Sequence, residues 1–222
     1  MITFEGAGKA FRGRKKGEIN WILRNLNVTF PDKVNAGILA PRGQGKTTFI
    51  NLACGNDWPS EGRIFRRGKV SFPWNSRANI SNKLSGRQNL RFLTDVYGRD
   101  FNDVYDFVRD FSELGRYLDM PLKNYNTEMR SRLSVSAMFG LGFDYILVDD
   151  LMEGGDNSFR KRCVGYLHEN KDSLTLLIAT GNTQIVQKYC EVAGVLNEGV
   201  LTFYDSVEDA IRAFNKVNQV FL

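Results

Sequence analysis

An α/β protein is predicted from the sequence, with a mixed, largely parallel sheet core, an antiparallel β subdomain and a helical subdomain. Short apolar runs typical of buried parallel strands recur at 34–39, 145–148 and 174–179. Apolar residues at helical spacing fill much of the chain between the first and second of these runs. Residues 2–11 and 20–30 look like two further strands, and the second has the apolar alternation of a half-buried edge sheet.

The composition favours a single domain, 1–222, with room for a subdomain. Aromatic residues make up 12% of the chain, which argues against disorder, and the formal net charge of +5 is modest. The three cysteines are odd in number and lack metal-ligand spacing, so they suit a reducing compartment. No apolar run approaches the ~20 residues that cross a bilayer, and residues 1–30 contain charges throughout, so we expect no signal peptide and a soluble, cytosolic chain.

The elements before the core begin with the two N-terminal strands, which the basic cluster Arg12-Gly13-Arg14-Lys15-Lys16 separates. We interpret this cluster as a solvated loop, with contact to acidic lipid or nucleic acid as the alternatives. Glu61-Gly62-Arg63 and Arg67-Gly68-Lys69 are turn signals around a short strand. The polar segment 73–86 is interpreted as a functional or mobile loop.

Helices are predicted from apolar residues that recur every three or four positions. One set predicts a helical subdomain of about 86–140 inserted in the core, and a separate helix is expected over 129–139. The last sheet element begins at 193–196. A final stripe predicts a C-terminal helix packed on the core, with a partner surface as the alternative. The first set is Leu90, Leu93, Val96, Tyr97, Val104, Phe107, Val108 and Phe111, and the stripe is Val207, Ala210, Ile211, Phe214 and Val217.

A phosphate-binding loop is predicted directly after the first buried strand. The stretch Ala40-Pro41-Arg42-Gly43-Gln44-Gly45-Lys46-Thr47-Thr48 has the spacing G-x-x-x-x-G-K-[ST] but begins with Ala. A strand, loop and helix in this order direct backbone N–H groups and a helix N-terminus at one anion. Lys46 is expected to reach the β- and γ-phosphates, and the Thr47 hydroxyl to bind Mg²⁺. The alternative is a Gly-rich turn that contains Gly-Lys-Thr by chance.

A pair of carboxylates follows the second buried strand, about a hundred residues after the loop. Asp149 stands where phosphate chemistry requires a carboxylate that holds Mg²⁺ through water. Asp150 follows directly. Many ATPases with a phosphate-binding loop carry at this position the residue that orients or polarises the attacking water. A polar strand end at a sheet edge is the alternative for both residues.

Several blocks match one family in the order in which they occur in the chain. They are Leu84–Phe92, Phe111–Lys123, Tyr125–Leu133 and Gly155–Cys163. Together they resemble the ATP-binding subunits of ABC transporters, most of all the branch that exports capsular polysaccharide and O-antigen chains. The similarity runs from about residue 2 to about residue 215.

The resemblance implies a P-loop NTPase fold of the ABC ATPase type, with ATP and Mg²⁺ as cofactors. Two copies, most simply a homodimer, would sandwich two ATP molecules, each loop facing the other copy's signature residues Asn126, Thr127 and Glu128. Their closure would move a transmembrane permease subunit, contacted through 73–85. The chain would lie peripherally on the cytoplasmic face of the inner membrane and energise polysaccharide export without binding the polysaccharide. No nucleic-acid partner is expected.

The resemblance also assigns roles to individual residues. The positions at which this chain departs from the family are mostly catalytic or nucleotide-binding positions. Phe11 falls where the family has an aromatic residue that stacks on adenine, with core packing as the alternative. Asp150 replaces the catalytic Glu and retracts the carboxylate by on the order of 1 Å, a misplacement that can cost ~10²-fold in rate. Gly181 replaces the switch His and has no side chain to contact the γ-phosphate. The only His, His168, lies away from every motif and is expected on the surface.

Three further replacements lie in the binding loops. Asn126 replaces the signature Ser and can still donate a hydrogen bond. Glu128 replaces the signature Gly and would repel the phosphates. Ala40 replaces the first Gly of the phosphate-binding loop, at a cost on the order of 1 kcal/mol if that position needs positive φ. Binding of Mg-ATP is therefore expected to survive better than hydrolysis.

The sequence supports two main hypotheses for the function. The first is an ABC transporter ATPase that energises polysaccharide export, with catalytic residue Asp150 and slow hydrolysis. The second is a catalytically impaired nucleotide-binding regulator or scaffold of such a membrane assembly. A nucleic-acid-associated ATPase rests only on the basic cluster and the net charge.

Overall fold

The computed structural model describes residues 1–222 except 14, 16, 75–79, 151–155 and 219–222. The chain forms two compact units, and each unit is assembled from segments that lie far apart in the sequence. The first unit consists of Met1–Pro73, Asp144–Leu151 and Asp172–Leu222, and the second of Trp74–Phe143 and Met152–Lys171.

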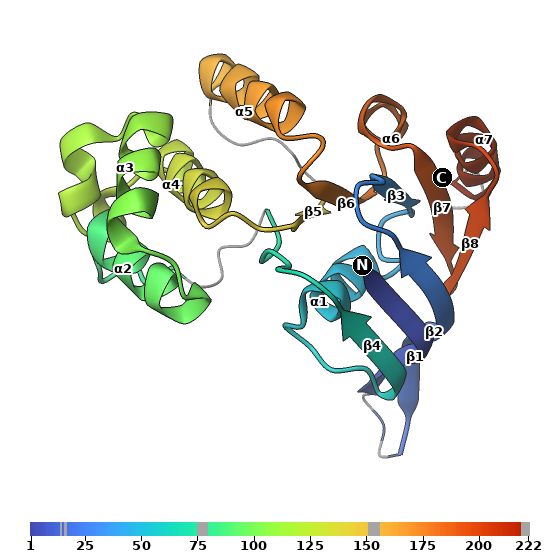
Figure 1. Cartoon of the computed structure of the whole chain (residues 1–222). Coiled ribbons are helices and arrows are strands. Elements are labelled where there is room, and N and C mark those ends of the chain that lie inside the picture. The colour runs from blue at the N-terminus through green and yellow to red at the C-terminus, as the bar shows by residue number, and fades with distance from the viewer. Residues whose placement is uncertain (14, 16, 75–79, 151–155, 219–222) are drawn as a thin grey trace. The chain divides into compact units, whose positions relative to one another are not determined.

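A largely parallel sheet forms the centre of the first unit (Figure 1). Within the described residues its strand order is β5-β6-β3-β7-β8, and only β8 runs antiparallel to its neighbour. Burial explains why β3, β5 and β6 each contain an apolar run in the sequence. The half-exposed edge strand β8 has no such run and was not predicted. The bounds are β3 Ala36–Leu39, β5 Tyr145–Asp149, β6 Thr175–Thr180, β7 Val192–Asn197 and β8 Val200–Tyr204.

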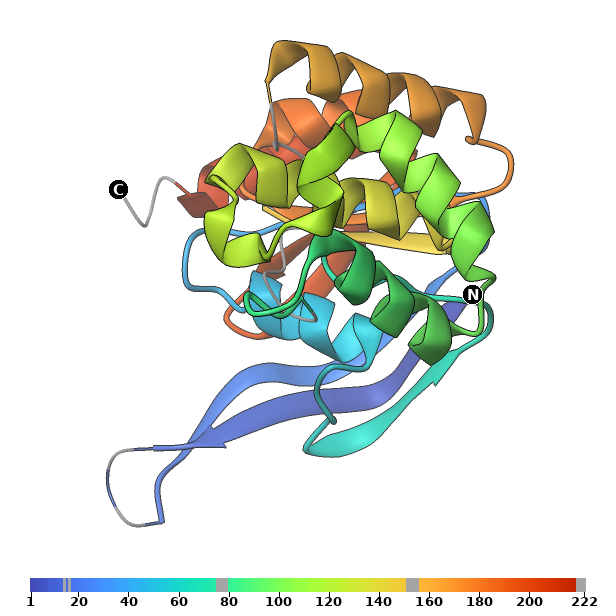
Figure 2. The same cartoon turned by 90° about the vertical axis from the view of Figure 1, so that its left-hand side faces the viewer.

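A separate antiparallel sheet in the order β2-β1-β4 belongs to the same unit, and its strands are β1 Ile2–Arg12, β2 Ile19–Phe30 and β4 Glu61–Arg66. The hairpin of β1 and β2 extends beyond β4 (Figure 2). The turn predicted at Glu61-Gly62-Arg63 is wrong, because these residues form the first half of β4. Gly62 has a φ of 72°, and a Cβ there would lie 2.2 Å from the Gly6 carbonyl oxygen. A turn-type residue is therefore needed inside the strand, where two backbones approach closely.

The helices of the first unit are α1 Lys46–Cys54, α6 Thr183–Tyr189 and α7 Val207–Asn218. The α7 residues Val207, Ala210 and Phe214 are buried in one cluster with Leu39 of β3 and Ala193 of β7. Core packing, the preferred interpretation of the C-terminal apolar stripe, is thereby confirmed for these three residues.

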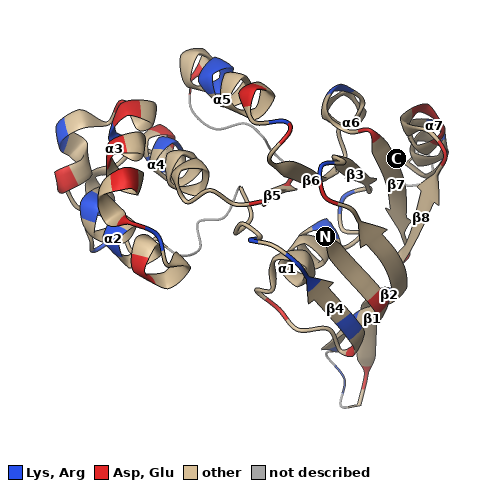
Figure 3. Cartoon of the chain, viewed as in Figure 1, with Lys and Arg blue, Asp and Glu red and all other residues tan. Residues whose placement is uncertain are grey.

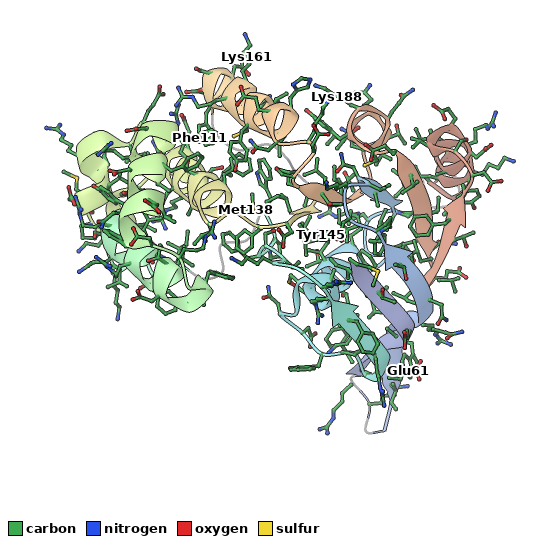
Figure 4. The ribbon with its side chains drawn as sticks, in the orientation of Figure 1. Glu61, Phe111, Met138, Tyr145, Lys161 and Lys188 are labelled. Atoms are coloured by element: carbon green, nitrogen blue, oxygen red, sulfur yellow. The ribbon has the colours of Figure 1, made fainter. Side chains whose placement is uncertain are left out.

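The second unit is helical, with α2 Gly86–Tyr97, α3 Phe101–Ser112, α4 Thr127–Gly140, α5 Asn157–Glu169 and two short 3₁₀ helices, Gly115–Asp119 and Leu122–Asn124. The side chains of Ser85, Asp100, Asn126 and Asp156 cap the N-termini of the four α-helices. An aromatic cluster joins α3, α4 and α5 around the Phe111 ring, which Figure 4 labels. The ring centroids of Phe139, Phe159 and Tyr166 lie 5.6–5.8 Å from that of Phe111.

The mixed sheet, the antiparallel sheet and the helical unit confirm the predicted α/β fold class. Among the described residues, no helix has the length and apolar character needed to span a membrane. Three predictions fall partly outside the described residues: the basic cluster includes 14 and 16, the polar loop 73–86 includes 75–79, and the block 155–163 begins at 155. His168 is exposed in the last turn of α5, as expected.

Candidate nucleotide-binding site

The predicted phosphate-binding loop connects the buried strand β3 to helix α1. Gly43 and Gly45 adopt φ values of 83° and 92°, which glycine reaches without strain. A Cβ at Gly45 would lie 2.8 Å from Cγ2 of Ile22, whereas one at Gly43 would meet no atom within 4 Å. No side chain caps the N-terminus of α1, so its first N–H groups remain available to an anion.

Ala40 does not carry the strain that the sequence suggested. It is absent from the described residues with positive φ, and its side chain is fully buried. Its N–H donates to the Thr180 carbonyl oxygen at 3.2 Å, so the residue continues the pairing of β3 with β6. The replacement of Gly by Ala at the start of the motif therefore fits a core position rather than a turn.

Lys46 is the first residue of α1, and its side chain folds back into the loop. Its ammonium donates to the carbonyl oxygens of Ala40 at 3.1 Å and Pro41 at 3.2 Å. The same nitrogen lies 3.6 Å from a carboxylate oxygen of Asp150, although only 8% of the Lys46 side chain is exposed. The cation is thus already removed from water and held where phosphates would meet the helix N-terminus.

Thr47 and Asp149, the predicted magnesium ligands, lie in contact with each other. The Thr47 hydroxyl donates to Oδ2 of Asp149 at 2.8 Å, while Oδ1 is buried and has no hydrogen-bond partner among the described residues. An orphaned carboxylate oxygen beside a hydroxyl fits Mg²⁺, which prefers oxygen ligands and retains several waters. The described residues contain no cluster of three His, Cys, Asp or Glu, so water and phosphate would complete the coordination.

Burial raises the pKa of Asp149, the Thr47 hydrogen bond lowers it, and the nearby Asp150 raises it again, with a net upward shift. The carboxyl therefore stabilises the fold fully only below its unfolded-state pKa, and this stabilisation is lost as the pH rises through the folded pKa. We expect Asp149→Asn to raise the free energy of unfolding of the nucleotide-free chain near pH 7, with the gain vanishing in acid. Chemical denaturation between pH 4 and 7 without Mg²⁺ tests this.

Asp209→Asn is the matched control for that measurement. A hydrogen bond from Arg212 is the main cause that lowers the pKa of Asp209, so its loss should lower the free energy of unfolding near pH 7. An Asp149→Asn variant that is also less stable at neutral pH would contradict the expected sign.

Asp150 directly follows β5 and is hydrogen-bonded to the end of β6. Its Oδ1 accepts a hydrogen bond from the Gly181 N–H at 3.3 Å, and its own N–H donates to the Ala179 carbonyl oxygen at 2.7 Å. The residue has a φ of 64°, a conformation that Asp tolerates better than most residues. Its side chain is 52% exposed, so the carboxylate is accessible to water.

The remaining predicted residues of the first unit are more open. Arg42, Gly43 and Thr47 are exposed, Gln44, Gly45 and Thr48 are half-buried, and Gln44 accepts from the Glu198 N–H at 2.9 Å. Phe11, at the end of β1, is 46% exposed, with the Lys9 ammonium 5.1 Å from its ring centroid. This exposure excludes the core alternative and leaves adenine stacking as a prediction.

The predicted signature residues begin helix α4 of the second unit. Asn126 is the N-cap, and its side-chain oxygen accepts from the Met129 N–H at 2.8 Å, a bond that does not use its amide NH₂ group. Thr127 and Glu128 are exposed in the first turn. The Glu128 carboxylate is not isolated, because it lies 3.2 Å from Nε of Arg132 one turn later.

Sequence reasoning missed Arg132 and the role of the Gly181 backbone. The spacing of Glu128 and Arg132, four residues apart on a predicted helix, could have indicated their ion pair. The contact between Asp150 and Gly181 depends on the φ of Asp150 and has no sequence signal.

No protein-family model matches the chain, but proteins similar to it over nearly their full length are ATP-binding proteins of polysaccharide transport or export. The polysialic acid transport ATP-binding protein KpsT of Escherichia coli is 34% identical over 222 residues, which cover 97% of this chain and 99% of that protein. The capsule polysaccharide export ATP-binding protein CtrD of Neisseria meningitidis serogroup B is 29% identical and covers 98% and 100%.

Solved structures agree on the fold. A dimeric bacterial ABC transporter cassette superimposes with a TM-score of 0.77 at 18% identity, covering 93% of this chain and 99% of that one. An ATP-binding subunit of an ABC transporter gives a TM-score of 0.74 at 15% identity, covering 97% and 99%. The predicted ABC ATPase fold is therefore confirmed. Taken with the full-length relatives, these findings show that the chain belongs to the polysaccharide-export ATP-binding proteins of the ABC transporter family.

Proposed function

We propose that the chain is the ATP-binding and ATP-hydrolysing subunit of an ABC transporter that exports a capsule-type polysaccharide across the inner membrane. The contact between Thr47 and Asp149, beside a buried carboxylate oxygen without a partner, carries this proposal. A hydroxyl, and a carboxylate that acts through water, are the protein groups that hold phosphate-bound Mg²⁺ in this class of site. The names of the relatives supply the transported class, a cell-surface polysaccharide.

The residues of the loop act first. Lys46 exchanges the carbonyl oxygens of Ala40 and Pro41 for β- and γ-phosphate oxygens, because a charged acceptor binds an ammonium more strongly than a neutral one. The N–H groups of residues 43–48 bind the same phosphates, and Phe11 stacks on the adenine. Thr47 and Asp149 would hold Mg²⁺, Asp149 through water, and the ion would neutralise charge on the phosphates. Asp150 then orients the attacking water.

Hydrolysis is proposed to be slow because of the residues that follow β5 and β6. Asp150 is shorter than the Glu of the family, and its carboxylate is engaged by the Gly181 N–H and the Lys46 ammonium. Gly181 has no side chain to order the water. A nucleophile misplaced by about 1 Å can cost ~10²-fold in rate.

The proposed assembly has two copies of the chain and a transmembrane permease subunit. The dimeric form of the bacterial cassette supports a second copy, with Asn126, Thr127 and Glu128 facing the nucleotide of the other copy. The chain is proposed to lie peripherally on the cytoplasmic face of the inner membrane, with the polysaccharide passing through the permease.

The test is ATP turnover in the membrane complex, co-purified through the permease. We expect turnover on the order of 0.1 s⁻¹, ~10²-fold below the ~10 s⁻¹ typical of enzymes, and a fall to background in Lys46→Ala. Background turnover in the unchanged complex that is also unaffected by Lys46→Ala would contradict the proposal.

A second candidate is a nucleotide-binding regulator or scaffold that does not hydrolyse ATP. The absence of a side chain at Gly181 and the engagement of Asp150 by Lys46 favour it. Both candidates predict that ATP binds to the complex. The second candidate alone predicts that ATP turnover in the unchanged complex stays at background.

A further inference from the structure

Arg132 of α4 lies at the centre of a cluster of three carboxylates in the second unit. Its Nε lies 3.2 Å from Glu128, its Nη1 lies 3.3 Å from Glu113, and its Nη2 lies 2.6 Å from Asp156. Nη1 also donates to the Ser112 carbonyl oxygen at 3.1 Å. One guanidinium thus ties the first turn of α4 to the end of α3 and to the N-cap of α5.

This guanidinium is largely removed from water. The Arg132 side chain is 12% exposed, against 46% for Glu128, and its guanidinium carbon lies 5.1 Å from the centroid of the Phe159 ring. Partial burial and several charge-assisted hydrogen bonds make such a cation a stronger partner than an exposed one. Burial lowers the pKa of Arg132, but the hydrogen bonds that its guanidinium donates to Asp156, Glu113 and Glu128, together with the charge of Asp156, outweigh burial and raise the pKa. Arg132 is therefore a fixed positive charge.

The same cluster holds Arg132 in place without Glu128. Asp156, Glu113 and the Ser112 carbonyl bind the two Nη atoms, whereas Glu128 binds only Nε. Glu128 is thus the partner added to a guanidinium that other elements position. Elsewhere in the unit, α3 and α5 each carry residues of both signs (Figure 3).

We propose that Arg132 is a positioning residue of the signature segment: it draws the Glu128 carboxylate back along α4 and neutralises its charge, so that the N-terminus of α4 can face a polyphosphate. The proposal rests on the proposed function, which brings this terminus to the nucleotide held by a second copy of the chain. It explains how the segment can carry a carboxylate where its family has glycine. An unpaired carboxylate there would repel the phosphates.

The test is a double-mutant cycle of Arg132→Gln and Glu128→Gln in the full chain, read out as nucleotide-dependent self-association. Sedimentation velocity with Mg²⁺ and the β,γ-imido analogue of ATP gives the dimer dissociation constant without hydrolysis. We expect Arg132→Gln to weaken association about tenfold when Glu128 is present and less than about threefold in the Glu128→Gln background. Effects on the fold alone occur in both backgrounds and cancel in the cycle.

Two further variants distinguish neutralisation of the Glu128 charge from a general effect on the fold of the helical unit. Arg162→Gln is the matched control, because Arg162 pairs with Glu113 and donates to the Phe111 carbonyl oxygen but makes no contact with Glu128. It should show no coupling to Glu128→Gln. Glu128→Gln alone tests the proposal even if Arg132→Gln fails to fold: with Arg132 intact, it should change the dimer dissociation constant by less than about threefold.

Equal losses from Arg132→Gln in both backgrounds would overturn the proposal and leave Arg132 a purely structural residue. Association tightened tenfold or more by Glu128→Gln alone would also overturn it, since the carboxylate would then be unneutralised. An unchanged chain that associates no better with nucleotide than Lys46→Ala would instead overturn the proposed function, and with it this inference.

Discussion

Replacing Lys46 with Ala is expected to weaken the binding of Mg-ATP by about 10²-fold or more. The ammonium is buried, already stripped of water, and held by two carbonyl oxygens that a phosphate can displace. Removing one partner of a buried charged contact costs ~2–5 kcal/mol, and each 1.4 kcal/mol is tenfold in affinity. The variant also leaves the Ala40 and Pro41 carbonyl oxygens without this donor, so a lower free energy of unfolding should accompany the loss.

Isothermal titration calorimetry of the purified chain with Mg-ATP measures this effect. Lys188→Ala is the matched control, because Lys188 is exposed on α6 (Figure 4), and its ammonium lies 5.0 Å from the centroid of the Tyr189 ring and contacts no other group among the described residues. The control should bind as the unchanged chain does. A Lys46→Ala affinity within about threefold of the unchanged chain would mean that the loop does not hold the phosphates.

The double variant Asp150→Glu with Gly181→His is expected to raise ATP turnover in the membrane complex by about 10²-fold. The longer side chain returns the carboxylate by about 1 Å, and the imidazole can contact the γ-phosphate and the attacking water. There is room at residue 181, because a Cβ there would lie 3.5 Å from the Ala40 carbonyl oxygen. Glu at position 150 must adopt a φ near 64°, which costs on the order of 1 kcal/mol of stability.

Single-turnover hydrolysis separates this gain from product release. Asp150→Asn is the control: it keeps a residue that tolerates positive φ but removes the carboxylate, and its turnover should fall below that of the unchanged chain. If the double variant binds ATP and gains nothing, the water is oriented by other groups. Adding Glu128→Gly should change the result little, because Arg132 already pairs with that carboxylate.

The fold was predictable wherever burial leaves a pattern in the sequence. Strands β3, β5 and β6 each contain a buried apolar run, and this pattern located both the phosphate-binding loop and Asp149. Prediction failed where an edge strand lacks such a pattern, as in β8, and where a glycine serves close backbone packing rather than a turn, as at Gly62.

The site was predictable only as far as local spacing determines it. The motif around Lys46 and the Asp149-Asp150 pair could be identified, but not the folding of the Lys46 side chain onto the loop carbonyls. That geometry depends on contacts between residues far apart in the chain. Two expectations were wrong. Ala40 is not strained, because its N–H pairs with Thr180, and the charge of Glu128 is not unpaired, because Arg132 contacts it.

The discontinuous first unit has a consequence for synthesis of the chain. Thr47 and Asp149 are 102 residues apart, and the intervening chain contains most of the second unit. At ~5–20 residues per second, a ribosome needs about 5–20 s to proceed from one to the other. The phosphate-binding loop therefore emerges well before its carboxylate partner, and the central strand β3 must wait for both neighbours, β6 and β7, while the helical segment is translated and can begin to fold.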